Sequence, residues 1–192
     1  LLRGKSLSYN CPATAFCMKA AVTSSTFSLP IARGFSRLSC VAFSFYTGVG
    51  KEAITFNHPL AGAAPAGAND LLRYHLSIGS MRTPTFDVEG VCEQWYRARM
   101  AMQILDRDDN TIDIPPHDFR NTRGVFMLNL ERAVNEDPDV GHTGQSTRNG
   151  SQLTIQLKGC QNPGGANQLM IFVTCFYDSL VQLNAAGVSL MD

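Results

Sequence analysis

The chain has 192 residues, with 16 basic and 16 acidic side chains, and charged residues make up only 17% of it. A chain of this length fits one domain that buries about 70% of its unfolded surface, so folding does not require disulfides. The balanced charge, without a block of one sign, argues against a dedicated nucleic-acid or membrane-surface protein. No apolar run reaches the roughly 18 residues of a transmembrane helix.

Low charge combined with many Gly, Ser, Thr, Asn and Phe residues is typical of a β-protein with many turns, and of a subunit that its neighbours cover. Six cysteines lie without the paired spacing of a metal site. They are Cys11, Cys17, Cys40, Cys92, Cys160 and Cys175. We expect all six to be free thiols in a reducing host compartment.

The N-terminal segment, Leu1–Ser25, has no sustained periodicity. It is predicted to be an extended N-terminal arm, either disordered or tied to something else, and residues 26–192 are predicted to form a single domain. Because the chain begins with leucine rather than methionine, we expect a processed product or a fragment of a longer polypeptide.

Short segments rich in aromatic and β-branched residues predict strands along the rest of the chain. Their ranges are 26–29, 35–47, 54–56, 72–78, 111–114, 124–131, 153–157, 170–177, 180–183 and 188–191. Where these segments alternate, one set of side chains faces inward. The predicted inward residues are Val41, Phe43 and Phe45; Leu72, Tyr74, Leu76 and Ile78; Phe126, Leu128 and Leu130; and Leu153, Ile155 and Leu157. The run 170–177 is apolar nearly throughout, which predicts burial on both faces.

One long helix is predicted, over Val88–Leu105. Gly79 and Pro84 are expected to end the preceding strand, and Asp87 is a good N-cap. The apolar stripe of this helix is formed by Val88, Cys92, Trp95, Met102 and Leu105. On the wet face, Glu93 and Arg97 are a favourable i,i+4 pair.

About eight strands, one helix and no regular βαβ alternation predict an all-β fold. The natural architecture is an eight-stranded antiparallel jelly-roll sandwich with one inserted amphipathic helix at about 88–105. Two segments are predicted to be loops, Pro59–Ala68 with its small residues and Asn135–Asn149, which is acidic and then rich in Gly, Thr and Ser.

No pattern in the sequence indicates a catalytic, cofactor or metal site. The four histidines are scattered singly, without a second ligand at metal spacing. The acidic cluster from Asp106 to Asp113 lacks the glycine and closing glutamate of an EF-hand, so a solvated connection is favoured. His117 and Asp118 are adjacent, but neighbours in sequence rarely face each other as a catalytic base and its orienting group do.

Three residues are candidate intersubunit contacts. Arg120 and Arg123, in the segment FRNTRG, suit an anion or a neighbouring subunit, and the alternative is a solvated strand edge. The single tryptophan, Trp95, is a core or interface anchor rather than a stacking platform.

Three segments, taken in order, resemble the major capsid proteins of the double jelly-roll lineage of double-stranded DNA viruses. In Leu71–Met102 a strand ends near an Ile-Gly turn, and the chain passes a proline into a helix that carries Glu93 and Tyr96. In His117–Glu131 an aromatic, an arginine and an asparagine precede an alternating strand. Leu169–Asp192 is similar to the closing strands, with an aromatic-rich run, a glycine turn and a short apolar strand.

A double jelly roll normally needs well over twice this length, so the resemblance implies the C-terminal jelly roll of a longer protein or a single jelly-roll relative. It further implies a structural protein, not an enzyme, that self-assembles into trimeric, pseudo-hexagonal capsomers of an icosahedral shell. The implied partners are copies of itself, other capsid proteins and, in one version, a separate chain carrying a first jelly roll. The implied location is the virion. The two predicted loops and the arm are then candidates for contacts between subunits.

A soluble β-sandwich binding module, for carbohydrate or a receptor, is the alternative function. An exposed row of aromatic side chains or a calcium site on one sheet face would distinguish it. A hydrolase of the cupin kind needs histidines clustered on adjacent strands, and the separated histidines disfavour it.

Overall fold

The computed structural model describes residues 7–21, 24–47, 72–102, 114–121, 124–131, 144–148, 151–160, 169–184 and 187–191. Within these ranges the chain forms nine strands and two helices. They are β1 (Leu7–Ala21), β2 (Thr26–Ile31), β3 (Leu38–Thr47), β4 (Arg73–Ile78), β5 (Met81–Glu89), α1 (Val91–Ala101), α2 (Pro116–Asn121), β6 (Phe126–Asn129), β7 (Leu153–Lys158), β8 (Leu169–Asn184) and β9 (Gly187–Met191).

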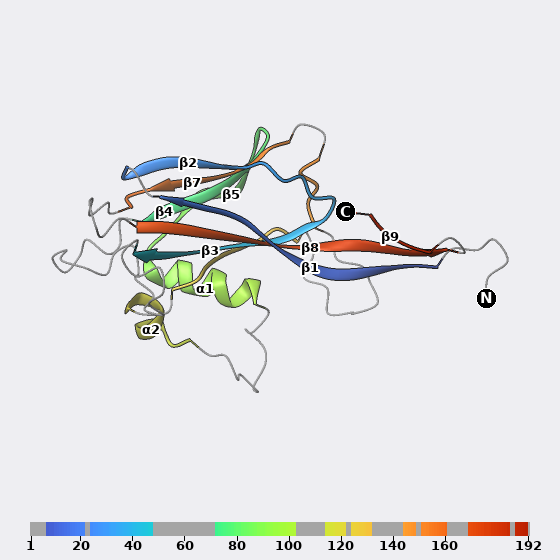
Figure 1. Cartoon of the computed structure of the whole chain (residues 1–192). Helices are drawn as coiled ribbons and strands as arrows, with labels where there is room; N and C mark the ends of the chain where they lie inside the picture. The colour runs from blue at the N-terminus through green and yellow to red at the C-terminus, as the bar shows by residue number, and fades with distance from the viewer. Residues whose placement is uncertain are drawn as a thin grey trace.

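The strands form two sheets that pack face to face (Figure 1). Sheet A has the order β1-β8-β3-β6, with β9 also paired to β8, and sheet B has the order β2-β7-β4-β5. The pairs run inward from the two ends of the chain: β1 with β8, β2 with β7, β3 with β6 and β4 with β5, all antiparallel. A long antiparallel ribbon rolled over on itself gives this pairing, which is the jelly-roll arrangement. The predicted fold class is therefore confirmed.

The core lies between the inner faces of the two sheets and is rich in aromatic rings. Phe43 of β3 stacks on Phe126 of β6 with ring centroids 5.3 Å apart, and Tyr74 of β4 meets Phe43 edge-on at 5.0 Å. Phe45 and Phe119 also pack edge-on against Phe126. Such tilted and offset contacts add to the gain from burying large apolar surfaces.

The predicted inward faces are confirmed, because every residue of the four alternating sets is buried. The prediction that 170–177 is buried on both faces is wrong. Residues 171, 173, 175 and 177 are buried, whereas 170, 172, 174 and 176 are only partly covered. The apolar outer face of β8 therefore remains half exposed.

The predicted helix boundary is wrong, because Asp87 and Val88 belong to strand β5. Pro84 also lies inside β5, which is an edge strand of sheet B, where a missing backbone N–H costs little. The helix begins after Gly90. Its backbone φ of +79° is a conformation that residues other than glycine rarely adopt. Asp87 is thus not an N-cap, and its carboxylate binds across the sheet instead.

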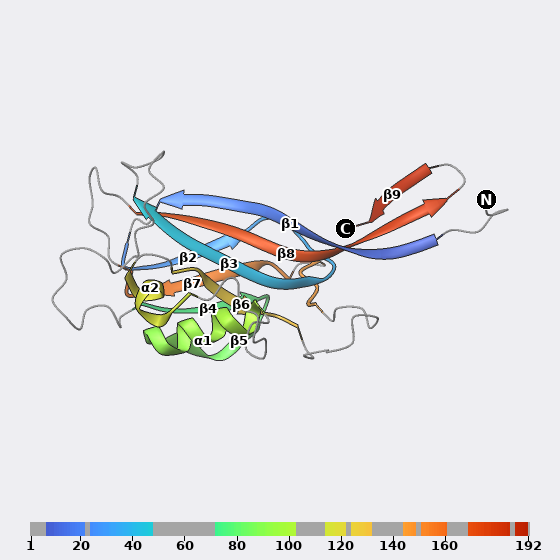
Figure 2. The same cartoon turned by 90° about the horizontal axis from the view of Figure 1, so that it is seen from below.

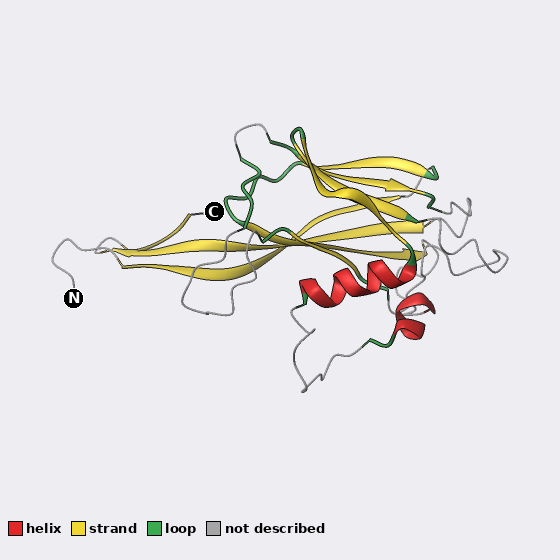
Figure 3. Ribbon diagram, turned by 180° about the vertical axis from the view of Figure 1, so that it is seen from behind, coloured by secondary structure: helices red, strands yellow, loops and turns green. Residues whose placement is uncertain are grey.

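The buried face of α1 also differs from the predicted stripe. Gln94 and Ala98 are the helix residues that are buried, while Cys92 is exposed and Trp95 is half-buried. The predicted Glu93–Arg97 pair is confirmed, with 2.8 Å between Nε and Oε1. A second, short helix that the sequence analysis did not predict, α2, lies beside α1 (Figure 3).

Helix α1 packs on β6 and covers the outer face of sheet A there. Met127, which alternates with the inward-facing Phe126 and Leu128, is buried as a result. Gln94 secures the helix, because its side-chain Nε2 donates a 2.8 Å hydrogen bond to the carbonyl of Leu72, just before β4. One end of the sandwich is thus three layers thick.

Residues 7–21, within the predicted arm, form strand β1 and pair with β8 almost throughout. Ala15 of β1 is buried in the core, so this segment contributes to the sandwich. The division of the chain at residue 25 stays a prediction.

Part of the predicted loop 135–149 is tied to the sandwich. Gln145 exchanges two backbone hydrogen bonds with Leu38 at the start of β3. Gly144 is needed there, because a Cβ atom would come within 2.8 Å of the backbone of Arg37 and Leu38. The remainder of that loop, the loop 59–68, the predicted strand 54–56 and residues 111–113 of the predicted strand 111–114 lie outside the described residues.

Candidate assembly surfaces

A three-stranded ribbon projects from one end of the sandwich. Strands β1 and β8 continue past the other strands, and β9 folds back beside β8 (Figure 2). We define the projecting ribbon as the three segments 7–12, 178–184 and 187–191. Leu7 is paired with Leu183, which is paired in turn with Val188, so three strands share this register.

The ribbon exposes large apolar side chains. Leu7 is 54% exposed, Tyr9 47% and Val188 70%. One face of a strand in a sandwich normally packs on the opposite sheet, but the ribbon extends beyond the strands of sheet B (Figure 1). Exposed apolar side chains on a strand with an unpaired edge are features of a surface that another chain covers.

A row of aromatic side chains crosses the outer face of sheet A, away from the core. Phe16 of β1 lies 6.1 Å from Phe172 of β8, and Tyr46 of β3 lies 5.1 Å from the same ring. Phe16 is 62% exposed. This aromatic row is the feature that the sequence analysis named as the mark of a binding module.

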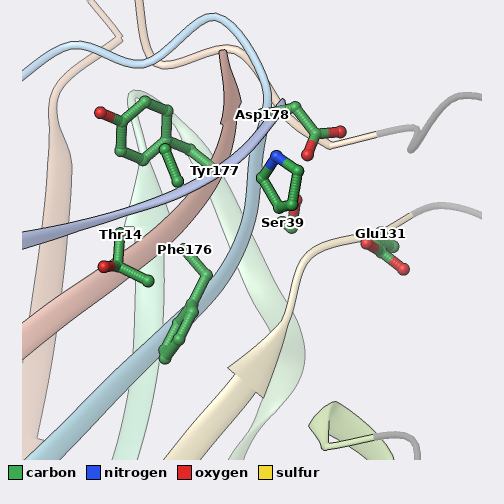
Figure 4. A pocket seen from close by; sticks show the side chains of 8 residues that line it. Thr14, Ser39, Glu131, Phe176, Tyr177 and Asp178 are labelled. Atoms are coloured by element: carbon green, nitrogen blue, oxygen red, sulfur yellow. The ribbon is translucent and has the colours of Figure 1, made fainter. Parts of the chain in front are cut away.

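A pocket of about 210 Å³ lies at the base of the ribbon, where β1, β3 and the end of β6 meet β8. Its lining is formed by Pro12, Ala13, Thr14, Ser39, Glu131, Phe176, Tyr177 and Asp178. In Figure 4, Ser39 lies between the carboxylates of Asp178 and Glu131, and Phe176 and Thr14 form the opposite side.

Asp178 gives this pocket a polar end. The residue is only 4% exposed, and its Oδ2 has no hydrogen-bond partner within the described part of the chain. A buried carboxylate oxygen without a partner is costly. The pocket therefore suits a cationic or hydrogen-bond-donating group with an apolar stem, such as a side chain of a neighbouring subunit.

The outer face of sheet B carries a charged cluster around Asp87. The carboxylate of Asp87 lies 2.7 Å from Nδ1 of His75 and 3.0 Å from Nζ of Lys158, and it also accepts from Arg82. These groups come from β5, β4 and β7, so the cluster ties three strands together. Beside it, Arg73 and Glu89 form a more exposed pair at 2.8 Å.

These neighbours lower the pKa of the Asp87 carboxyl below its usual 3.8. Burial by itself raises the pKa, but the hydrogen bonds from Lys158 and His75 and the positive charge of Arg82 outweigh burial. Asp87 is thus a structural anion at neutral pH.

Trp95, a predicted intersubunit contact, lies on α1 with its indole N–H donating to the carbonyl of Ile114 at 2.7 Å. The guanidinium of Arg99 lies 4.9 Å from the centre of the indole ring, a cation–π arrangement. Trp95 packs against the core and is half-buried, so it anchors the helix. Its neighbour Tyr96 is 49% exposed. A contact of Trp95 with another subunit stays a prediction.

The two predicted contact arginines are placed differently. Arg120 belongs to α2, whereas Arg123 lies outside the described residues. Their roles stay predictions too.

Within the described ranges, no three His, Cys, Asp or Glu side chains gather in a way that could hold a metal ion. His117 and Asp118 come within 3.5 Å of each other on α2, at the surface. The acidic run 106–113 lies outside the described residues. Neither described helix is long and apolar enough to cross a membrane.

The sequence analysis missed the ribbon, the pocket and the aromatic row. A signal for the ribbon was present in the apolar run at 180–183, the Ala-Ala-Gly turn and the apolar residues at 188–191. The partner strand β1 carried no such signal, because its side chains alternate weakly.

Comparison with known proteins gives a likeness of fold. No protein-family model matches the sequence, and no curated protein matches it either. The crystal structure of PBCV-1 VP54, fitted into a cryo-EM reconstruction of the virophage Sputnik, is similar over 97% of this chain, with a TM-score of 0.58 and 8% identity. The structure of the mavirus major capsid protein covers 98% of this chain and 41% of its own, with a TM-score of 0.44 and 10% identity.

The chain spans about half the length of the VP54 chain that it matches, 51%. At 8% identity the likeness shows the fold alone. For the fold, the resemblance to double jelly-roll capsid proteins is confirmed.

Proposed function

We propose that this chain is a structural capsid protein that self-assembles into trimeric, pseudo-hexagonal capsomers of an icosahedral shell. The observation that carries the proposal is the VP54 likeness, which covers nearly the whole chain. That crystal structure has been fitted into the reconstruction of a virophage particle, which is a use that suits a shell component. The proposed location is accordingly the virion.

The chain spans about half of VP54, so a subunit of that length needs a second jelly roll in addition to this one. We propose that it comes from a further stretch of a longer polypeptide or from a separate chain. Two jelly rolls in each of three subunits would give six similar units around one axis, hence a pseudo-hexagonal outline.

The projecting ribbon supplies the contact surface that such an assembly needs. Its exposed Leu7, Tyr9 and Val188 offer apolar area at one end of the molecule, and the base pocket offers the unpartnered oxygen of Asp178 beside it. Interfaces between subunits combine an apolar centre with polar groups in this way. Within the segment 1–25, the exposed Leu7 and Tyr9 of β1 are the proposed contacts with a neighbour, and Trp95, Arg120 and Arg123 are further contacts.

The native mass of the purified chain tests the proposal. Light scattering at increasing concentration should give three times the 20.9 kDa chain mass, about 63 kDa, or a much larger shell. A stable monomer at every concentration, alone and with other capsid components, would overturn it.

A matched pair of variants locates the contact. Tyr9→Lys with Val188→Lys places charges on the ribbon and should abolish the trimer. Phe86→Lys changes a residue that is 83% exposed on β5, far from the ribbon along the chain and on the other sheet, and should leave the trimer intact. Equal trimer formation by the two variants would exclude the ribbon as the contact.

The aromatic row favours a second candidate function, a carbohydrate-binding module. Sugar rings stack on exposed aromatic faces, and Phe16 with Phe172 and Tyr46 provides them. Calorimetric titration with a panel of oligosaccharides tests this candidate. Heat of binding that Phe16→Ala abolishes would support it, and no heat from any sugar would exclude it for that panel.

A further inference from the structure

The base pocket lies on the outer face of sheet A, and the register of β1 with β8 defines its floor. In that register Pro12 is opposite Asp178. Thr14 is opposite Phe176, two residues further along each strand, so these four side chains share one face of the sheet. Ala15 points to the other face and is buried in the core. The pocket is therefore separate from the core and opens away from sheet B.

A β-bulge in β3 forms a second wall of the pocket. The register of β3 with β8 shifts between Leu38 and Cys40, so Ser39 is the extra residue of the bulge. The carbonyl of Ser39 accepts a 2.8 Å hydrogen bond from the backbone N–H of Leu130, at the end of β6. Glu131 follows directly and lines the pocket. The bulge thus brings a hydroxyl and a second carboxylate to the pocket.

Asp178 is the group that points to a ligand. The residue is 4% exposed, and its Oδ2 has no hydrogen-bond partner within the described ranges. Its backbone N–H donates to the carbonyl of Arg37 at 3.0 Å, but the guanidinium of Arg37 turns to Oδ1 of Asn10, at 2.9 Å. A buried carboxylate oxygen without a donor costs free energy, so a donor from outside the chain should bind there favourably.

We propose that the base pocket binds a primary ammonium group, and that this group is the side chain of Lys5 from a second copy of the chain. The source of the lysine rests on the assembly proposed above, whereas the chemistry of the pocket does not depend on it.

The shape and donors of an ammonium group match this pocket. An ammonium has three N–H donors, and three side chains with oxygen acceptors line the pocket, those of Asp178, Ser39 and Glu131. The four-carbon stem of a lysine would then pack on the apolar wall formed by Phe176 and Pro12. A guanidinium fits less well, because its five donors lie in a fixed plane and some would face that apolar wall unpaired.

The sequence narrows the choice of lysine. The chain has four, which are Lys5, Lys19, Lys51 and Lys158. Lys158 is already bound to Asp87 on sheet B, at 3.0 Å. Lys5 comes two positions before Leu7, the first residue of the ribbon. A ribbon that contacts a neighbouring copy therefore carries Lys5 towards that copy.

Lys5 does not reach the pocket of its own copy. The strand from Leu7 to Pro12 extends over five residue steps, about 17 Å. The two residue steps from Leu7 back to Lys5 cover at most about 7 Å, so even an extended side chain falls short of the pocket. The occupant must then come from a second copy.

The chemistry of the pocket is tested on the whole chain, diluted until light scattering gives the mass of one chain. The isotope-labelled protein is titrated with n-butylammonium chloride, which has the charge and stem of a lysine side chain. We expect saturable NMR shifts of the amides of Thr14, Ser39 and Asp178. n-Butanol has the stem without the charge, and calcium chloride has the charge without the stem, so neither should saturate these shifts. No saturable shift with butylammonium, or saturation by calcium or butanol, would overturn the proposal.

A matched pair of variants assigns the binding to the buried carboxylate. Asp178→Asn keeps the shape of the side chain and should weaken butylammonium binding at least about tenfold. Glu89→Gln removes an exposed carboxylate on sheet B and should leave the affinity unchanged. Equal affinities of the two variants would overturn the proposal. The comparison of the three probes needs only the wild type, so it decides even where Asp178→Asn fails to fold.

The source of the lysine is tested by assembly. Lys5→Met and Asp178→Asn should each raise the concentration at which half of the chain is trimeric at least about tenfold. The double variant should be no worse than either single variant, because both changes remove the same contact. Lys51→Met is the control and should assemble like the wild type. Additive effects, or an equal loss in Lys51→Met, would overturn the assignment of Lys5.

The two tests also separate this inference from the proposed function. A trimer that forms although butylammonium does not bind would overturn the pocket as an amine site and leave the proposed assembly standing. A chain that stays monomeric although butylammonium binds would overturn the assembly and, with it, the second copy as the source of the lysine.

Discussion

The two halves of β8 are both paired on two sides, but their neighbouring strands differ in how much apolar surface they leave exposed. Residues 169–177 pair with β1 and β3 above sheet B, and their inward side chains are fully buried. Residues 178–184 pair with β1 and β9; Asp178, Ser179 and Val181 are still buried, but the neighbouring strands of the ribbon leave Leu7, Tyr9 and Val188 exposed. A satisfied backbone therefore does not by itself bury a strand, because burial requires a second layer.

The comparison separates stability from assembly. The packed half supplies the apolar burial that drives folding. The projecting half leaves apolar area exposed, where another chain can contact it. Substitutions in the packed half should destabilise the monomer, and substitutions in the ribbon should leave its stability nearly unchanged.

The largest expected effect is in the aromatic core. Phe126→Ala removes a ring that contacts Phe43, Phe45, Tyr74 and Phe119. The cavity left behind should lower the free energy of unfolding by about 3–5 kcal/mol. Urea unfolding followed by tryptophan fluorescence measures the change. A loss under 1 kcal/mol would mean that the two sheets do not pack as described.

Two valines test the comparison directly. Val173→Ala, in the packed half, removes two buried methyl groups and should cost about 2–3 kcal/mol from transfer and cavity together. Val188→Ala, at a 70% exposed position on the ribbon, should change stability by less than about 0.5 kcal/mol. Chemical denaturation of dilute monomer gives both values, and similar values for the two valines would remove the distinction between the halves.

The packed half is also the part that the sequence predicts best. Leu72, Tyr74, Leu76 and Ile78 alternate because one face of β4 meets the core, so their burial follows from spacing alone. The same holds for β6 and β7. Each of these faces is determined by local alternation, which does not depend on knowing the partner strand.

The helix boundary is a different case, because apolar spacing there suits both a strand end and a helix start. Val88 continues the strand β5, and Gly90 supplies the backbone turn that separates strand from helix. The sequence did contain this glycine, which is a signal for a break. The burial of Gln94 had no local signal, because its partner is the Leu72 carbonyl, 22 residues away.

The ribbon and the base pocket depend on pairing between strands that are distant in sequence. Residues 7–21 find their partners in β8 between 149 and 176 positions away along the chain, and a bulge between Phe16 and Met18 shifts the register. Periodicity within a short window contains no information about such a register. This is why the candidate surfaces emerged only from the structure.

A buried polar contact sharpens the comparison further. Gln94→Ala leaves the Leu72 carbonyl without its donor beneath α1, which should cost about 1–3 kcal/mol. The matched control on the ribbon is Ser189→Ala, whose hydroxyl donates a longer bond of 3.4 Å to Gln182 in contact with water. That control should cost less than about 0.5 kcal/mol. Thermal unfolding of both variants gives the comparison, and a larger loss from Ser189→Ala would contradict it.

The smallest expected effect is electrostatic and depends on pH. The folded-state pKa of Asp87 lies below its ordinary 3.8, so the stabilisation is fully present above that value. The stabilisation is lost as the pH falls through the lower folded-state pKa. Protonation then removes the negative charge of Asp87, with which Lys158, His75 and Arg82 interact. Asp87→Asn should therefore cost about 1 kcal/mol at pH 7, and the difference from wild type should fade below about pH 4.

Glu89→Gln is the matched control for Asp87→Asn, because Glu89 is on the same strand but pairs with Arg73 while more than half exposed. Water screens that pair, so the control should change stability by only a few tenths of a kcal/mol at any pH. Urea unfolding from pH 3 to pH 7 compares the two variants. A pH-independent loss in Asp87→Asn would assign its role to shape rather than charge. The stability contributed by the outer face of sheet B would then come from packing alone, as it does on the inner face. The charges around Asp87 would then be available for a contact between subunits.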